Sequence, residues 1–173
     1  PVFADILPDT LCLDPADGRE LWAVEVLERF GAKNPQWGQS QCLLVDGSRV
    51  LVAPGGPKCM VAALDRQTGQ TVWTGEPLKF MRTHAFGGKE VDPPQSDTDK
   101  SGYASLTLLE ADGRRVVGGC SGRHFYCAEA ASGKLLWTHE MNPRYEVNAC
   151  MPARWGKSLV FGMNGPLVRV DIA

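Results

Sequence analysis

The chain has 173 residues, a formal net charge of −2 and an isoelectric point of about 5.9. Its length suits one domain with a hydrophobic core, and its balanced charge argues against a nucleic-acid partner. No apolar run approaches the ~20 residues that span a bilayer, so we expect no transmembrane segment.

The first predicted elements are the two strands of a hairpin. Apolar residues over 10–14 and 20–26 flank a turn, and residues 1–28 are therefore interpreted as the outer strands of a partial blade. Residues 27–36 are a connection with room for one helical turn. The sequence has neither an initiator Met nor a signal-peptide pattern, and it starts beside one hairpin and stops inside another. We therefore expect an internal piece of a longer protein.

A complete four-stranded unit is predicted over residues 37–77. Asp46-Gly47 is a hairpin signal between the first two strands, and a Pro-Gly-Gly-Pro turn at 54–57 separates the second from the third. The four strands are expected at 39–46, 49–53, 60–65 and 70–74.

The rest of the chain holds one insertion, a second complete unit and a further partial one. Residues 78–100 carry Gly, Pro and charge, and we expect an inserted surface loop there. A second complete blade is predicted over 101–141, with a turn at Asp112-Gly113. A partial blade follows over 147–173, with turns at Trp155-Gly156 and Asn164-Gly165.

An internal repeat links these units. An acidic residue is followed four residues later by Gly and four residues after that by Trp, and a fourth copy begins at Val168. Such a period predicts a repeat architecture. The three full copies are Asp14, Gly18 and Trp22; Asp65, Gly69 and Trp73; Glu129, Gly133 and Trp137.

Each position of the repeat has a physical reason. The carboxylate lies where a strand enters a turn, and it can accept backbone N–H groups there. The Gly falls where a short hairpin loop needs a left-handed residue. The Trp follows on the returning strand, where its ring can cover a neighbouring sheet. Glu129, being longer than Asp, is expected to hold its turn less tightly.

This frame resembles the tryptophan-docking repeat of PQQ-like, quinoprotein dehydrogenase-like β-propellers. Longer stretches resemble secreted bacterial PQQ-binding-like repeat proteins: 31–40, 44–47, 54–56 and 61–65. The resemblance implies an all-β fold, namely a fragment of a β-propeller built from four-stranded antiparallel blades. Two blades would be complete and two partial, and all would belong to one domain. It also implies that Trp22, Trp73 and Trp137 anchor neighbouring blades. The departures are Cys12 and Cys127 in place of the usual Ala.

The resemblance leaves two functions open. The favoured one is a non-catalytic, extracytoplasmic (periplasmic or secreted) scaffold that binds proteins or ligands on its loop face, with the missing blades of the same protein as partners. It would need no cofactor. The alternative is a fragment of a PQQ-dependent alcohol or sugar dehydrogenase, which would need PQQ and calcium. We assign no catalytic, cofactor-binding or metal-binding residue.

Four smaller features of the sequence give weaker signals. Residues 97–102 match the start of a calcium loop, but Leu108 replaces the Glu that would complete it, so a solvated acidic loop is expected. His84 is the histidine best placed to meet a ligand, although a plain surface role is favoured. Trp37 and Trp155 are expected to fill core or blade packing rather than line a groove. The six Cys form no C-x-x-C pair and are expected to be mostly buried free thiols, with disulfides as the alternative.

Overall fold

The computed structural model describes residues 2–6, 9–85, 87–141, 143, 145–162 and 167–172, and for 2–6 and 9 the backbone alone. The fold is all-β, as the sequence predicted, because these residues form a series of small antiparallel sheets with one short helix. No helix among the described residues is both long and apolar enough to cross a membrane.

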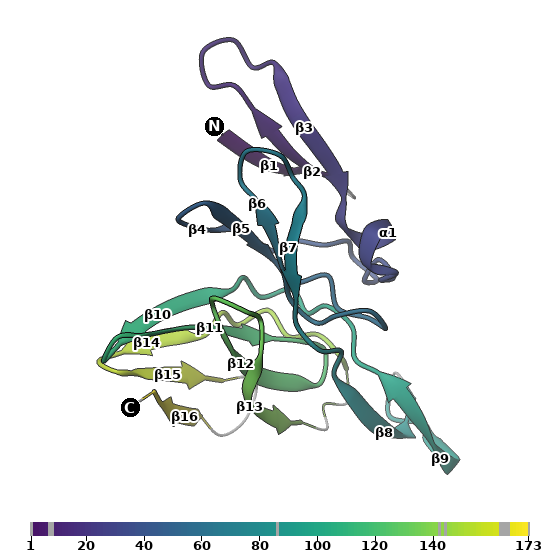
Figure 1. The fold of residues 1–173 in the computed structure, drawn as a ribbon. Coiled ribbons are helices and arrows are strands. Elements are labelled where there is room, and N and C mark those ends of the chain that lie inside the picture. Colours follow the sequence, from purple (N-terminus) through teal and green to yellow (C-terminus); the bar gives the residue numbers. More distant parts are fainter. Residues whose placement is uncertain are drawn as a thin grey trace.

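Four sheets follow one another along the chain (Figure 1). Each is an antiparallel meander in which consecutive strands pair. The first contains β1 (Val2–Ile6), β2 (Asp9–Leu13) and β3 (Glu20–Glu25). The second contains β4 (Leu44–Asp46), β5 (Arg49–Val52), β6 (Ala62–Asp65) and β7 (Thr71–Thr74). The third contains β10 (Thr107–Ala111), β11 (Arg114–Cys120), β12 (His124–Glu129) and β13 (Leu135–Glu140). The fourth contains β14 (Ala153–Trp155), β15 (Ser158–Phe161) and β16 (Val168–Asp171).

Two parts of the sequence differ from the expectation. The first sheet has a third strand, β1, which pairs with β2 from Val2↔Leu13 to Ile6↔Asp9. The inserted segment, expected as a loop over 78–100, forms a hairpin of β8 (Lys79–His84) and β9 (Glu90–Thr98). Its Gly, Pro and charged residues suggested a loop, but a two-stranded hairpin open to solvent tolerates them. Figure 1 shows this hairpin projecting away from the four sheets.

The core lies between the sheets, in three apolar clusters. Each cluster joins residues of two consecutive sheets, so each sheet packs its face on the next one. The first includes Cys12, Trp22, Val24, Val50 and Leu64, together with Val26 and Phe30 of helix α1 (Val26–Phe30). The second includes Leu51, Met60, Leu106, Val117 and Tyr126, and the third includes Val116, Phe125, Cys127, Leu159 and Phe161.

The same hairpin recurs at the outer end of the first three sheets. In each, the N–H of the repeat Gly donates to the carbonyl of the repeat acid, at 2.8, 2.9 and 2.8 Å. The Gly residues have φ of 75°, 68° and 76°, which is the left-handed conformation the sequence predicted. A β-bulge precedes each turn, between Cys12 and Leu13, Ala63 and Leu64, and Cys127 and Ala128.

A candidate functional site on the connector face

Antiparallel meanders place successive connections alternately at two ends of a sheet. The segments that join one sheet to the next therefore share an end with the β5–β6 and β11–β12 turns, and we call this end the connector face. Isolated β-bridges hold it together, between Gly55 and Lys100 and between Ser101 and Ser121. The hairpin β8–β9 belongs to the segment that joins the second sheet to the third.

Asp99 is the buried centre of one polar cluster on this face. Its side chain is 1% exposed, and one carboxylate oxygen accepts hydrogen bonds from the Ser121 hydroxyl and from the backbone N–H of Arg123, at 3.1 Å for the latter. His124 Nδ1 lies 2.7 Å from the same oxygen. The hydroxyl and the imidazole both point to the carboxylate, which differs from a catalytic relay in which the imidazole takes the proton of the hydroxyl. The cluster therefore fixes the β11–β12 turn to residue 99.

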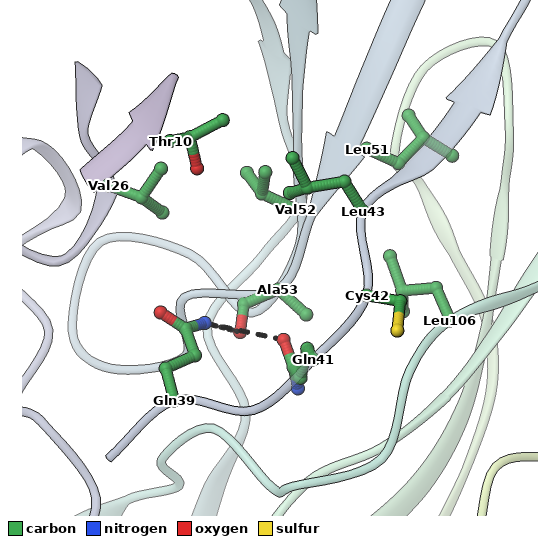
Figure 2. Close-up of a pocket in the computed structure, with 10 residues that line it drawn as sticks. All are labelled: Thr10, Val26, Gln39, Gln41, Cys42, Leu43, Leu51, Val52, Ala53 and Leu106. Atoms are coloured by element: carbon green, nitrogen blue, oxygen red, sulfur yellow. Dashed lines mark hydrogen bonds between the residues drawn. The ribbon is translucent and has the colours of Figure 1, made fainter. Parts of the chain in front are cut away.

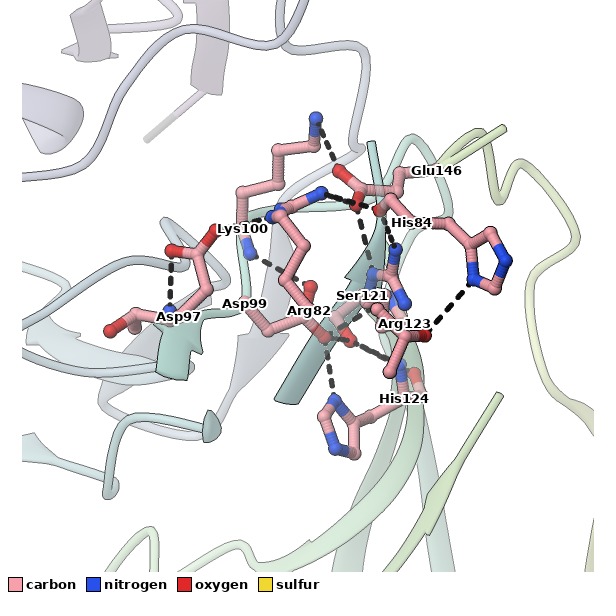
Figure 3. Close-up of polar contacts among 11 residues, drawn as sticks. Arg82, His84, Asp97, Asp99, Lys100, Ser121, Arg123, His124 and Glu146 are labelled. Carbon is pink, nitrogen blue, oxygen red and sulfur yellow. Dashed lines mark hydrogen bonds and ion pairs between the residues drawn. The ribbon is translucent and has the colours of Figure 1, made fainter. Parts of the chain in front are cut away.

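Glu146 lies beside it and pairs with three cations (Figure 3). Its carboxylate lies 2.7 Å from Arg82, 2.9 Å from Arg123 and 2.8 Å from Lys100. Burial by itself would raise the pKa of Glu146, but the hydrogen bonds from Lys100, Arg123 and Arg82 outweigh it and lower the pKa from 4.5 to about 2. Glu146 is therefore ionised across the physiological range. It joins the segment between β13 and β14 to the β8–β9 hairpin.

The same cations hold the hairpin to the third sheet. Arg82 also pairs with Asp97 across the hairpin, at 2.6 Å. The Phe80 ring lies between two guanidinium groups, 5.0 Å from Arg82 and 4.3 Å from Arg123. Arg123 also donates to the backbone carbonyl of His84, at 3.2 Å. The base of the hairpin is thus fixed by charge pairs, cation–π contacts and a buried aromatic ring.

Sequence reasoning missed most of these residues. It drew attention to His84, whose backbone carbonyl takes part, while its ring lies 3.0 Å from the Thr83 hydroxyl. It expected Asp99 in a solvated acidic loop, and that was wrong because the side chain is buried and fully engaged. Arg82, Arg123 and Glu146 carry no local motif, and Arg82 and Glu146 are 64 residues apart. Nothing in their spacing could have indicated the cluster.

The repeat tryptophans lie at the contacts between sheets. Trp22 of β3 donates its indole N–H to the carbonyl of Arg66 in the second sheet, at 3.1 Å. A Cβ built on Gly69 would lie 2.8 Å from the same ring. Trp73 of β7 lies over Gly133 of the third sheet in the same way, since a Cβ there would come within 2.4 Å of its ring. Each ring therefore rests on the turn Gly of the following sheet.

Trp137 has a different environment. It stacks on His139, with ring centroids 6.0 Å apart, and tilts against Phe161, at 5.7 Å. The next turn Gly of the repeat would come after Asp171, the acid of the fourth copy. Trp137 therefore packs on its own sheet and on β15.

The repeat acids act on their own turns. Asp65 accepts the backbone N–H groups of Gln67 and Thr68, each at 2.9 Å, and the Thr68 hydroxyl at 3.0 Å. These bonds lower the pKa of Asp65, the Thr68 hydroxyl most of all. Asp14 accepts the N–H of Ala16 at 2.9 Å.

Glu129 instead accepts the hydroxyl of Ser132. That the longer Glu129 holds its turn less tightly stays a prediction.

Polar contacts add to the joints between sheets at the end opposite the connector face. Asp46 is buried in the β4–β5 turn and pairs with Arg49 at 2.8 Å and with Arg115 of the third sheet. Arg49 also donates to the carbonyl of Ala131, at 3.0 Å. These contacts join the second and third sheets beside the contact of Trp73 with Gly133.

Trp37 and Trp155 were expected to fill core or blade packing, and a place in the core is wrong for both. Their exposed fractions are 61% and 66%. Trp37 tilts against Tyr103 on the connector face, with centroids 5.9 Å apart. Trp155 lies in β14 under the guanidinium of Arg169, at 5.1 Å.

The described cysteines are free thiols, as expected. Four are buried and two, Cys42 and Cys150, are exposed.

The cavity in Figure 2 is too small for an organic ligand. It lies between the first two sheets, has a volume of about 10 Å³ and is lined by Thr10, Gln41 and apolar side chains. Gln39 donates to Gln41 and to the Ala53 carbonyl at its edge, at 3.3 and 3.4 Å. That volume holds about one water molecule.

Comparison with known proteins identifies one family. The PQQ-like repeat model described as outer membrane protein assembly factor BamB matches residues 6–86 and 58–171. No curated protein matches the chain.

Among solved structures, a BamB structure shares the fold of this chain. The crystal structure of BamB from Moraxella catarrhalis aligns with a TM-score of 0.53 and 18% identity, over 95% of this chain and 40% of that one. Two others align less well. The computationally designed Ika8 protein has a TM-score of 0.35 and 15% identity, over 94% of this chain and 52% of that one. The quinohemoprotein alcohol dehydrogenase ADHIIG from Pseudomonas putida HK5 has a TM-score of 0.29 and 14% identity, over 79% of this chain and 32% of that one. The chain thus spans less than half of the M. catarrhalis BamB structure.

Proposed function

Because the chain belongs to the PQQ-like β-propeller repeat family of outer membrane protein assembly factor BamB, we propose that it acts as a non-catalytic binding scaffold outside the cytoplasm. In this proposal it binds other proteins through its connector face. Further blades of the same protein complete the ring, which accords with its coverage of 40% of the M. catarrhalis BamB structure.

The observation that carries the proposal is the combination of a fixed connector face and exposed large side chains on it. The carboxylates of Asp99 and Glu146 are engaged in holding the hairpin and the turns. Around them, Trp37, Met81 and Met151 are each more than half exposed. Aromatic and Met side chains on a rigid support are typical of protein-binding surfaces.

We further propose that Trp22, Trp73 and Trp137 fasten consecutive blades. The support is the contact of the first two rings with the turn Gly of the next sheet. Under this proposal Trp137 does the same with a blade that follows. The acid, Gly and Trp repeat then holds the blades of the propeller together, and the connector face is left free for binding.

The described residues do not fit a calcium and quinone site. They contain no group of three or more His, Cys, Asp and Glu side chains arranged to hold a metal ion. The acids nearest the face are paired: Asp97 with Arg82, Asp99 with His124, and Glu146 with three cations.

Site-specific photo-crosslinking in the native compartment tests the proposal. A benzophenone side chain would replace Met81 or Met151 on the connector face, and Val72 on the outer strand β7 as the control, since Val72 is equally exposed. We expect discrete protein adducts at the two Met positions and none at Val72. Adducts of the same kind at all three positions, or at none, would contradict the proposal. So would dye reduction by the full-length protein loaded with PQQ and calcium, or its recovery in the cytoplasmic fraction.

A further inference from the structure

Among the described residues, strand β8 pairs with β9 alone, along one edge. The register runs Lys79↔Thr98, Phe80↔Asp97 and Met81↔Ser96. The Asp99 N–H donates to the Leu78 carbonyl at 2.8 Å, which shows that 78 and 99 form a hydrogen-bonded pair. Hydrogen-bonded and non-hydrogen-bonded pairs then alternate along the hairpin. Residues 78, 80 and 82 thus turn their backbone groups toward β9, and Lys79 and Met81 turn theirs away. Within the described part of the chain, the backbones of Lys79 and Met81 make no hydrogen bond outside the strand ladder.

The opposite edge of the hairpin offers fewer donors. In β9, Pro93 and Pro94 have no N–H to give to an added strand, and the N–H of Thr98 is bonded to the Asp97 carboxylate at 2.8 Å. Ser96 keeps an outward N–H, so of the two edges that of β8 presents the fuller row of donors and acceptors.

The edge of β8 is also held in place before anything binds. Phe80 is buried between two guanidinium groups, and Arg82 pairs with Asp97 and Glu146. A strand that is already ordered loses little conformational entropy when another pairs with it, so a short partner segment can gain affinity there.

We propose that the free edge of β8 takes up one antiparallel strand from a partner protein. The inference rests on the proposed protein-binding function. The side chains of Lys79 and Met81 share one face of β8, and both are exposed. Cross-strand pairing then favours an apolar partner residue opposite Met81 and an acidic one opposite Lys79. The partner segment is thus extended, with an apolar residue two positions before an acidic one.

Amide NMR of the full chain with capped peptides tests this inference. The probe is Thr-Val-Thr-Glu-Thr, and the matched control has Lys in place of Glu. We expect the probe to shift the amide resonances of Lys79 and Met81 and to slow exchange of the Met81 N–H, with the Lys peptide at least about tenfold weaker.

Two variants at one position separate pairing from side-chain contact. Met81→Pro removes an N–H that points away from β9, so the β8–β9 ladder remains, and binding should fall by at least about tenfold. Met81→Thr keeps the N–H and should stay within about threefold of the wild type. Lys79→Glu should reverse the preference between the two peptides.

The outcomes distinguish this inference from the proposed function. Equal binding by the Pro variant, or shifts confined to other sheets, would overturn the strand-addition site while crosslinks from Met151 could still support the scaffold. Loss of the Met81 crosslink in a Lys79→Glu protein that keeps the Met151 crosslink would support the site. Loss of neither crosslink would count against it.

Discussion

The indole N–H of Trp22 donates to the backbone carbonyl of Arg66, 44 residues later in the chain, at 3.1 Å. The bond reaches from β3 into the hairpin turn of the next sheet, and the ring rests on Gly69 in that turn. One side chain thus satisfies a turn carbonyl and covers a Gly that has no side chain. Trp73 covers Gly133 in the same way, although its own Nε1 makes no hydrogen bond within the described structure.

Replacing the turn Gly should therefore weaken the joint between sheets. Gly69→Ala and Gly133→Ala each add a Cβ against an indole ring at positive φ. The left-handed backbone alone costs an Ala about 1–2 kcal/mol of unfolding free energy, and the steric contact adds to it. Chemical denaturation of the full chain measures the difference.

Gly18→Ala is the matched control for this prediction. Gly18 holds the same place in the repeat with φ 75°, but a Cβ there would meet nothing within 4 Å. It should show the backbone cost alone. Equal losses for Gly18 and Gly133 would mean that the ring contact contributes nothing.

The tryptophans should divide into two classes on truncation. Trp22→Ala empties a site in the core between two sheets and should cost about 3–5 kcal/mol. Trp155→Ala removes a ring that is 66% exposed and should cost about 1 kcal/mol or less. Urea unfolding followed by circular dichroism would rank them, and a Trp155 loss as large as that of Trp22 would contradict the assignment.

Glu146 should make stability depend on acid pH. Its pKa is lowered from 4.5 to about 2 in the folded chain, so its contribution is complete above about pH 4.5 and is lost as pH falls toward 2. Glu146→Gln should cost ~2–3 kcal/mol at neutral pH and flatten the acid limb of the stability curve. The measurement is the unfolding free energy between pH 2 and 7.

Glu110→Gln serves as the control for charge removal. Glu110 pairs with Arg115 at 3.4 Å at the surface, with a side chain 67% exposed. A surface pair of this kind contributes little, so its curve should keep the wild-type shape. An acid limb that changes equally in both variants would argue against the Glu146 cluster as its source.

Thiol reactivity should follow burial. Burial raises the pKa of the Cys59, Cys120 and Cys127 thiols to about 12, while Cys42 and Cys150 are exposed. Because the thiolate is the reactive form, iodoacetamide at pH 8 should label the two exposed residues in the folded chain and all six after denaturation. Peptide mass spectrometry reads the sites, and rapid labelling of Cys127 in the native state would disagree with its place in the core.

The features that could be predicted from the sequence are those that depend on neighbouring residues, namely the repeat hairpins and their strands. The acid, Gly and Trp positions mark each hairpin because turn geometry and strand return lie within nine residues, and β6 and β7 lie within the expected ranges 60–65 and 70–74. The strand β1 and the hairpin β8–β9 were missed, since Pro and charge are compatible with an exposed edge as well as with a loop.

The polar cluster could not have been predicted in the same way. Arg82, Asp99, Arg123 and Glu146 come from four separate segments, and only the packing of the third sheet against its neighbouring connections brings them together. Each is an ordinary charged residue in its own sequence context. The burial of Asp99, Arg123 and Glu146, and the hydrogen bonds that lower the pKa of Glu146 in spite of burial, exist only in the folded chain.

The recurring bulge sets a size limit on one position of every repeat. In the three bulged hairpins the residue opposite the tryptophan is Cys12, Ala63 or Cys127, and all three are buried. A thiol and a methyl group are nearly the smallest side chains available, so the indole can lie flat toward the following sheet. A Leu or Phe at Cys12 or Ala63 would lift the ring of Trp22 or Trp73 away from the turn Gly that it covers and open the contact between two sheets.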